Sequence, residues 1–328
     1  MSRVTVLMPV YNGEPYLRKA VDSVLGQTLE DIQLICIDDA STDSSPEILS
    51  WYAALDSRVL VITHNVNTGQ AIARNDGIRM ADGDFITMVD ADDWLSPDAL
   101  ELAVAGFEAD SRTDTVLLEL RYVRDGVEEP YPLRSGKREW SGAEAMELSL
   151  DWSLHGLYVA KRELFVRYPY DTTCRLYSDD NTTRLHYLHS DRVTVCNGIY
   201  YYRQYAQSMT NAISPCRYDL LEANTSMARM LCEENIPAAV RSRFERERWI
   251  NLTGICIYWM TYDEQSETVD RNNAILHRLE AVYDDVDRSL LPLSLKLKLG
   301  YRPCGSFSRY LSEVRRYDKM RKLLKRCR

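Results

Sequence analysis

The chain has 328 residues, of which 27% are charged and 45% hydrophobic, as in soluble globular proteins with room for two domains. Its net charge of −9 argues against general nucleic-acid binding, so we expect no nucleic-acid partner. The 8 cysteines are scattered without a C-x-x-C pair, which excludes an obvious zinc or thioredoxin-type motif and favours free thiols in a reducing compartment.

The chain shows no targeting or membrane-spanning pattern. A strand is predicted directly after Arg3, which leaves no room for a signal peptide. No apolar run approaches the roughly 20 residues that a transmembrane helix needs. We therefore predict a cytoplasmic protein.

Short apolar runs alternate with amphipathic segments over the first 90 residues. The runs at 4–10, 32–37, 58–63 and 85–89 are typical of strands buried on both faces. Helices are predicted between them, one after the Asn12-Gly13 turn, one capped by Ser45 and one over residues 70–80. This β-α-β-α-β-α-β order predicts a mostly parallel sheet with helices on both faces.

The later elements are less regular. A helix is predicted over 97–107, a strand over 115–120 and a hairpin turn at Asp125-Gly126. Ser141 opens a helix with a capping box to Glu144, and a further helix starts on the carboxylates at 179–180. Strands at 193–196 and 199–205 follow. From residue 216 the pattern is helical, so we expect an α/β domain over 1–215 and a helical extension over 216–328.

Carboxylates gather where two of the predicted strands end. Asp90, Asp92 and Asp93 follow the fourth strand, and Asp39 follows the second. The carboxyl ends of parallel strands share one edge of the sheet, so these side chains are expected to face one crevice. A hard divalent cation, Mg²⁺ or Mn²⁺, would offset their repulsion and carry phosphates with it. The alternative for Asp90–Asp93 is a solvated acidic turn that caps the next helix.

Glycine-rich phosphate loops are absent from the sequence. No G-x-G-x-x-G follows the first strand and no Walker A lysine is present. A dinucleotide enzyme or a P-loop NTPase is therefore not expected, and a bound diphosphate would need a metal to hold it.

Several segments, taken in order, resemble the inverting family-2 glycosyltransferases, which have an A-type nucleotide-sugar fold. The similar segments cover roughly residues 1–212 and are 9–14, 35–43, 67–84, Asp90-Ala-Asp92-Asp93, Asp179-Asp180, 200–203 and 208–210. The late segments are similar to those of bacterial capsule and lipopolysaccharide transferases.

The resemblance implies a nucleotide-sugar donor site, with UDP as the usual nucleotide. Its expected members are Pro9, Tyr11, Asn12, Asp39, Arg74, Asp90 and Asp92. Asp39 would accept a hydrogen bond from the base, Asp90 would contact the ribose and Asp92 would bind the Mg²⁺ or Mn²⁺ ion. Arg74 is expected against the nucleotide, or paired with one of the nearby acids. Asp93 is expected to support the site or to cap the following helix.

The resemblance also implies the base that takes the proton from the acceptor hydroxyl. Asp180 is the expected base, because it matches the aspartate of the family's Glu-Asp motif, and Asp179 stands where the glutamate is usual. Either member of the pair is open as the base, and the alternative is that both cap a helix beginning at Asn181. The acceptor stretch 154–158 departs from the family pattern, and we expect His155 on the surface or at a pocket rim.

The end of the chain is strongly basic. Residues 295–328 contain 12 Lys and Arg against 2 Asp and Glu, a local charge of +10. Apolar residues at three- and four-residue steps, from Leu311 to Leu324, predict an amphipathic helix that binds an anionic membrane or packs on the acidic body of the same protein. Membrane contact would make the protein peripheral on the inner face of the cell membrane.

The leading hypothesis is a metal-dependent inverting glycosyltransferase that moves a sugar onto a glycan or lipid-linked glycan in surface polysaccharide synthesis. The alternatives are a nucleotidyltransferase and a non-catalytic nucleotide-sugar-binding partner of another transferase. The donor sugar and the linkage have no readable signal in the sequence.

Overall fold

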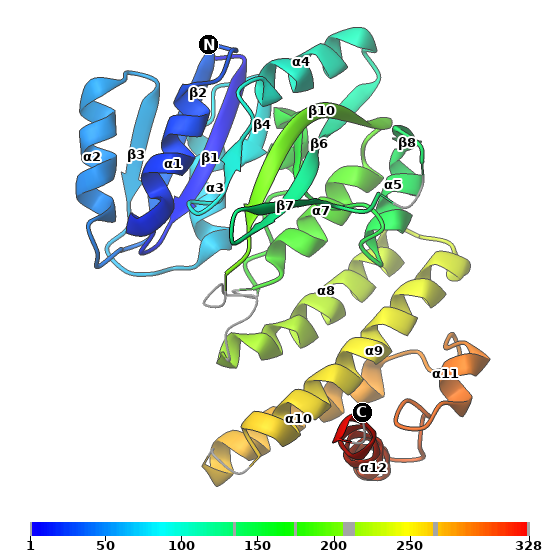
Figure 1. Cartoon of the computed structure of the whole chain (residues 1–328). Helices are drawn as coiled ribbons and strands as arrows, with labels where there is room; N and C mark the ends of the chain where they lie inside the picture. The colour runs from blue at the N-terminus through cyan, green and yellow to red at the C-terminus, as the bar shows by residue number, and fades with distance from the viewer. Residues whose placement is uncertain (1, 134–135, 174–175, 206–213, 265–267, 327–328) are drawn as a thin grey trace. The chain divides into compact units, whose positions relative to one another are not determined.

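The computed structural model describes residues 2–133, 136–173, 176–205, 214–264 and 268–326 (Figure 1). The chain divides into two compact units, Met1–Ala212 and Ile213–Arg328. Within the described ranges, no helix combines the length and the apolar content that crossing a bilayer requires.

The strands of the first unit form one ten-stranded sheet. They are β1 Val4–Val10, β2 Ile32–Asp38, β3 Val59–Thr63, β4 Phe85–Met88, β5 Trp94–Leu95, β6 Thr113–Arg124, β7 Val127–Pro130, β8 Glu139–Ser141, β9 Tyr158–Lys161 and β10 Arg192–Arg203. The main order is β3-β2-β1-β4-β9-β6-β10-β5, with β7 added on β6 and β8 on β10.

The sheet confirms the predicted α/β fold and adds a mixed second half. The first four strands in the order β3-β2-β1-β4 are parallel, as the alternating sequence pattern predicts. Strand β9 is antiparallel to both β4 and β6, and β6 pairs in parallel with β10. The parallel half therefore brings the carboxyl ends of its four strands to one edge of the sheet, next to the antiparallel strand β9.

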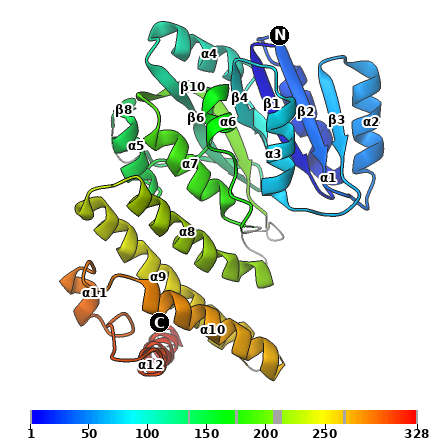
Figure 2. The ribbon, with the colours of Figure 1, turned by 180° about the vertical axis from the view of Figure 1, so that it is seen from behind.

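Helices cover both faces of this sheet. They are α1 Glu14–Leu25, α2 Ser45–Leu55, α3 Gln70–Met80, α4 Ala99–Ala109, α5 Gly142–Ser149, α6 Arg162–Arg167 and α7 Ser178–Leu188. Figure 1 shows α1 in front of the sheet, and the reverse view in Figure 2 shows α3, α6 and α7 in front.

Strand β1 lies at the centre of the core because every one of its residues is buried. Val6 and Met8 pack in the same apolar cluster as Leu17 and Val21 of α1. On the opposite face, Gly77 of α3 lies so close that a Cβ there would be 2.9 Å from Leu7 Cδ2. Because successive side chains of the strand point to opposite faces, β1 packs against α1 on one face and α3 on the other.

Most local predictions are confirmed. Helix α3 begins and ends at the predicted residues, Arg124 pairs with Val127 across the Asp125-Gly126 turn, and Ser141 forms the capping box with Glu144. The two late strands are one strand, β10, with a register shift between Val195 and Ile199.

Two predicted helix starts are wrong for the same reason. Ser45 does not cap α2, because it is already the first helical residue and its Oγ accepts a hydrogen bond from Gly13 N at 3.0 Å. The fourth helix begins at Ala99 rather than Pro97, because Ser96 N donates to Ile199 O at 2.9 Å. In both cases a partner distant in sequence competes with the local signal.

The second unit is helical, as predicted. Its elements are a 3₁₀ turn, Pro215–Tyr218, and the helices α8 Asp219–Glu233, α9 Ala238–Tyr262, α10 Val269–Asp285, α11 Leu293–Leu297 and α12 Phe307–Arg326. Trp249 of α9 and Tyr283 of α10 are fully buried in its core with Tyr310 and Val314 of α12. The first turns of α12 therefore pack on their own unit, whereas Leu323 and Leu324 remain more than 60% exposed.

Gly83 provides a test of this packing, because it lies against the backbone of β1. A Cβ at Gly83 would be 2.6 Å from Thr5 N and 2.9 Å from Val4 C. Since backbone atoms of a central strand cannot move aside, we expect Gly83→Ala to lower the free energy of unfolding by about 1–3 kcal/mol, measured by chemical denaturation.

The matched control is Gly254, in the interior of α9, where a Cβ would meet nothing within 4 Å. Gly254→Ala should raise the free energy of unfolding by about 0.5–1 kcal/mol, since alanine favours helix over glycine. A Gly83→Ala protein as stable as the parent would contradict the packing described.

Candidate active site

The turn after β1 holds the loop after β2. Asn12 adopts a positive φ of 53°, and its Oδ1 accepts a hydrogen bond from Thr42 N at 2.8 Å. Asn12 N donates to Ser41 Oγ at 3.0 Å. Pro9 pairs with Ile37 inside the sheet, whereas Tyr11 is 52% exposed. Of the three residues predicted here for the nucleotide pocket, Tyr11 offers its ring at the sheet edge and Asn12 shapes the loop.

Asp39 organises the loop that leads into α3. Its Oδ1 accepts hydrogen bonds from Thr68 N and Thr68 Oγ1, both at 2.8 Å, and its Oδ2 accepts one from Gly69 N at 2.7 Å. Burial raises the pKa of Asp39, but the hydrogen bonds from Thr68, His64 and Gly69 outweigh this and lower it. Asp39 is therefore an ionised, buried carboxylate that fixes the start of α3.

His64 is a site residue that the sequence analysis missed. Its Nδ1 lies 2.8 Å from Asp39 Oδ1 and its Nε2 lies 3.0 Å from Asp76 Oδ2. The ring thus links the end of β3 to both the loop and α3. The signal that could have found it is a histidine directly after a predicted strand, since that strand lies beside the one that ends just before Asp39.

Asp93 is a structural carboxylate. It is only 2% exposed, and it accepts hydrogen bonds from Tyr200 Oη at 2.8 Å and from Arg203 N at 2.7 Å. Burial, together with the charges of Asp90 and Asp92, raises its pKa well above the usual range. Since both partners belong to β10, Asp93 supports the site by joining two strands, and it does not cap α4.

Asp92 has a different environment from its neighbour. Its Oδ2 accepts a hydrogen bond from Tyr205 Oη at 2.9 Å, while Arg203 Nε donates to its backbone oxygen at 2.8 Å. Burial and the charge of Asp90 raise the pKa of Asp92. A carboxylate with a raised pKa beside a second carboxylate is stabilised by a nearby cation.

Arg74 joins the two carboxylate clusters. Its guanidinium is 4% exposed, and it lies 3.1 Å from Asp90 Oδ1 and 3.7 Å from Asp179 Oδ2. Its Cζ lies 5.2 Å from the centre of the Tyr170 ring. The carboxylates raise its pKa although burial lowers it, so Arg74 is charged. The predicted pairing with nearby acids is therefore present.

Asn75 explains how Tyr170 reaches this position. Its Nδ2 donates to Tyr170 O at 2.9 Å and its Oδ1 accepts from Tyr170 N at 2.8 Å. The side-chain amide thus holds the backbone of a segment 95 residues away. Nothing in the sequence around Tyr170 indicated this contact.

The second carboxylate pair lies in the first turn of α7. The helix begins at Ser178 after Tyr177, which has a positive φ of 66°. The predicted helix start at Asn181 is wrong, and neither carboxylate occupies the N-cap position of α7, which is Tyr177. Both lie in the first turn, where negative charge favours the helix N-terminus. Burial and the charge of Asp179 raise the pKa of Asp180 to about 7, although Arg184 opposes them. Such a group exchanges a proton near neutral pH.

His155 is not where the sequence analysis placed it. The residue is 4% exposed, and its Nδ1 accepts a hydrogen bond from Leu157 N at 3.3 Å. Burial lowers its pKa to about 3, so the ring is neutral. The prediction of a surface or rim position is wrong because the ring packs edge-on against Tyr131, which covers it.

The described residues contain no group of three or more His, Cys, Asp or Glu side chains arranged to hold a metal ion. A cation at Asp92 would bind the carboxylate there, and phosphate oxygens of a bound ligand could supply further ligands. This arrangement suits Mg²⁺ or Mn²⁺, which are commonly held by one or two carboxylates together with phosphate oxygens. Residues 208–210, part of the late similar segment, lie outside the described residues.

The candidate site has two adjacent groups of residues, one at the strand ends and one in the first turn of α7. The strand ends supply an exposed aromatic ring, Tyr11, and the carboxylates Asp90 and Asp92. The first turn of α7 supplies Asp180, whose pKa suits a proton acceptor, and Arg74 connects the two places. An arrangement of this kind can hold a phosphorylated ligand next to a general base.

Comparison with solved structures supports the fold. A Staphylococcus aureus TarS structure, residues 1–349 in complex with UDP, matches 96% of this chain and 88% of its own, with a TM-score of 0.70 and 17% identity. The Pyrobaculum calidifontis mannosyltransferase PcManGT, in complex with GDP-Man and Mn²⁺, matches 95% of this chain and 85% of its own, with a TM-score of 0.55 and 19% identity.

Sequence relatives cover less of the chain. An uncharacterised glycosyltransferase of Bacillus subtilis, EpsJ, is 32% identical over an alignment of 225 residues that covers 63% of this chain and 62% of EpsJ. A poly(ribitol-phosphate) beta-glucosyltransferase of Bacillus spizizenii is 39% identical over 122 residues, 36% of this chain and 19% of that protein. The chain thus spans only part of these relatives.

The family model for glycosyl transferase family 2 matches residues 5–174. The matched range is more than half of the chain, and it contains β1, the loop at Asp39 and the carboxylates Asp90 and Asp92. The chain therefore belongs to glycosyl transferase family 2.

Proposed function

We propose that the chain transfers a sugar from a nucleoside-diphosphate sugar, with UDP as the expected nucleotide, to a hydroxyl of a glycan or lipid-linked glycan. The product would belong to a bacterial surface polysaccharide. The observation that carries the proposal is the contact of one buried guanidinium, Arg74, with Asp90 after β4 and Asp179 in α7. This contact supports the proposal because it links the carboxylates that we assign to the donor with those that we assign to the acceptor.

The relatives support the classes of donor and product. TarS has been solved with UDP, and PcManGT with GDP-Man and Mn²⁺. The Bacillus spizizenii relative is named for a ribitol-phosphate polymer. Family membership favours sugar transfer over the nucleotidyltransferase and the non-catalytic binding partner considered from the sequence.

On the donor side, we assign the nucleotide to the edge formed by Pro9, Tyr11 and Asn12. Tyr11 is exposed and would stack on the base or ribose. Asp39 Oδ2 accepts one hydrogen bond, from Gly69 N, and keeps capacity to accept another from the base. Asp90 would accept a hydrogen bond from a ribose hydroxyl, while Arg74 pairs with its Oδ1.

Asp92 is the proposed metal ligand. Its carboxylate is half-buried beside Asp90, and both its burial and the charge of Asp90 raise its pKa. A Mg²⁺ or Mn²⁺ ion bound there would neutralise charge on the departing diphosphate. Tyr205 orients the Asp92 carboxylate through its hydroxyl, and Arg203 holds the backbone at the same residue.

On the acceptor side, Asp180 would take the proton as the acceptor oxygen attacks the anomeric carbon. The new C–O bond forms as the bond to the diphosphate oxygen breaks, and the nucleoside diphosphate leaves with the bonding electrons. A single displacement of this kind inverts the anomeric centre and needs no carboxylate nucleophile. Asp179 is paired with Arg74 and would position its neighbour.

These assignments place donor and acceptor chemistry within residues 1–215, and they leave 216–328 as an extension. A cytoplasmic location, where the chain would meet its nucleotide sugar, is part of the proposal. Contact with a membrane surface would suit a lipid-linked acceptor.

The base assignment is tested with Asp180→Asn, which removes the proton acceptor and keeps the shape. We expect sugar transfer to fall by about 10²–10⁴-fold while donor binding is retained. For the parent, kcat should rise about tenfold per pH unit below the Asp180 pKa of about 7 and level off above it, because only the ionised form accepts a proton.

Asp179→Asn is the matched control for that experiment, since it removes the neighbouring charge and leaves Asp180. It should lower the pH at which kcat levels off, because Asp179 raises the pKa of Asp180. A larger loss of transfer in Asp179→Asn than in Asp180→Asn would transfer the role of base to Asp179.

The metal assignment is tested by removing the ion and its ligand separately. EDTA should abolish transfer and added Mn²⁺ or Mg²⁺ should restore it, with thermal stabilisation by UDP depending on the ion. Asp92→Asn should lower transfer by about 100-fold or more, since several kcal/mol of charge stabilisation are lost.

Asp98→Asn is the comparison for Asp92, because Asp98 is an exposed carboxylate that accepts a hydrogen bond from Ser96. It should leave both metal dependence and transfer unchanged. Full transfer in EDTA, or a Mn²⁺-dependent UDP shift that persists in Asp92→Asn, would refute the metal role.

A further inference from the structure

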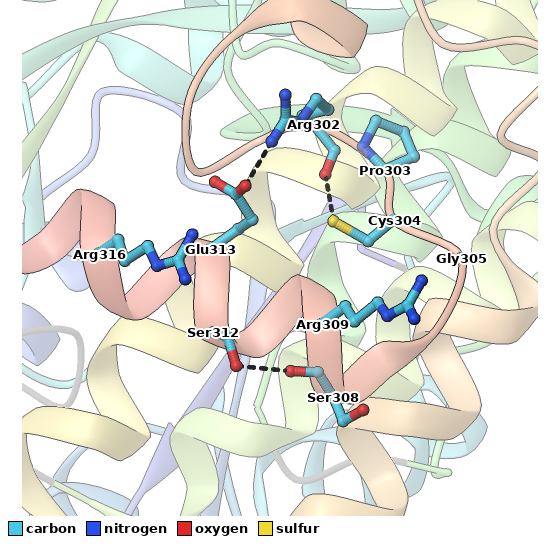
Figure 3. Close-up of a pocket in the computed structure, with 9 residues that line it drawn as sticks. All are labelled: Arg302, Pro303, Cys304, Gly305, Ser308, Arg309, Ser312, Glu313 and Arg316. Atoms are coloured by element: carbon cyan, nitrogen blue, oxygen red, sulfur yellow. Dashed lines mark hydrogen bonds and ion pairs between the residues drawn. The ribbon is translucent and has the colours of Figure 1, made fainter.

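A cavity of about 610 Å³ lies on the C-terminal unit, between α12 and the segment that precedes it (Figure 3). Its polar lining consists of Arg302, Ser308, Arg309, Ser312, Glu313 and Arg316. Three guanidinium groups and two hydroxyls surround a single carboxylate, so the cavity carries positive charge.

The single carboxylate is already engaged. Glu313 forms an ion pair with Arg302, which neutralises one of the three arginines. Arg309 and Arg316 remain as the excess charge, both exposed and two turns apart on the same side of α12. Guanidinium groups bind phosphate through paired hydrogen bonds, so the cavity favours a phosphate group as its ligand.

The same side of α12 becomes apolar toward the end of the helix. Leu323 lies seven residues after Arg316, and Met320 four, which places them on one stripe. Met320 is 42% exposed, Leu323 63% and Leu324 62%. The opposite side is closed, because Tyr310 and Val314 are fully buried in the core of this unit. The exposed stripe is therefore not needed to build the core.

The stripe can face a bilayer interface along its length. Arg316 and Leu323 are seven positions apart, about 10 Å along the helix axis. An interfacial helix lies in the plane of the membrane, with its apolar side buried about 5–10 Å into the boundary between headgroups and acyl chains. Residues 295–328 also carry a local charge of +10, which favours an anionic surface.

We propose that this side of α12 docks on a membrane containing anionic phospholipids. A lipid phosphate would occupy the cavity between Arg309 and Arg316, and Met320, Leu323 and Leu324 would contact the acyl region. The proposal does not depend on the donor chemistry, because the family match ends at residue 174 and the cavity lies in the other unit.

The test is co-sedimentation of the full chain with vesicles, without any nucleotide sugar. We expect binding to vesicles of phosphatidylcholine mixed with phosphatidylglycerol, and little binding to phosphatidylcholine alone. The double substitution Arg309→Gln/Arg316→Gln should weaken binding about 10–30-fold, at about 1 kcal/mol for each basic residue. Leu323→Gln/Leu324→Gln should weaken binding and make the remainder more sensitive to salt.

Matched controls separate the site from general charge and hydrophobicity. Arg167→Gln/Arg229→Gln removes the same charge from exposed positions elsewhere, and Leu55→Gln/Val166→Gln removes two exposed apolar side chains from the first unit. Both should bind vesicles as the parent does. All variants are first compared with the parent by thermal unfolding, so that a folding defect is recognised.

Three results would overturn the proposal. They are equal binding to both kinds of vesicle, equal loss in the charge control, and stabilisation by inorganic phosphate without vesicle binding, which would mean a soluble phosphate ligand. Asp180→Asn should bind vesicles normally, so failure of this proposal and failure of the proposed function are distinguishable.

Discussion

The buried guanidinium of Arg74 is the constraint on which the candidate active site depends. A charge that is 4% exposed needs carboxylate partners, because desolvation without them is costly. Arg74 has one partner after β4, Asp90, and one in α7, Asp179. Its place on α3 is in turn fixed by the hydrogen bonds of Asp39 to Thr68 and Gly69, just before that helix. Helix α3, the turn after β4 and helix α7 are thus held together by the charge of Arg74.

The three aspartates after β4 show how partners separate residues that look equivalent in the sequence. Asp93 is buried and both of its oxygens accept hydrogen bonds, one from Tyr200 and one from Arg203, so it ties the start of β5 to β10. Asp90 pairs with Arg74. Asp92 accepts a hydrogen bond from the Tyr205 hydroxyl and has a raised pKa, so a nearby cation would stabilise its ionised form. Specialisation within the cluster follows from hydrogen bonding, not from residue type.

The C-terminal helix has one packed side and one exposed side. Its first half supplies Tyr310 and Val314 to the core of its own unit, as a packed terminal helix does. Its second half exposes Leu323 and Leu324 on the side that also lines the arginine-rich cavity. Packing and the proposed membrane docking would use opposite sides of one helix, so the two would not compete.

The sequence by itself determined the α/β alternation, the carboxylate clusters at the strand ends and the helical C-terminal region, because these depend on local periodicity and turn residues. Only the tertiary structure decided which side chains meet. Ser45 looked like a helix cap but accepts from Gly13, and His155 looked exposed but is covered by Tyr131. The bridge from His64 to Asp39 and the antiparallel pairing of β9 were likewise not predicted. Each depends on partners distant in the chain, and the order of residues does not encode such contacts locally.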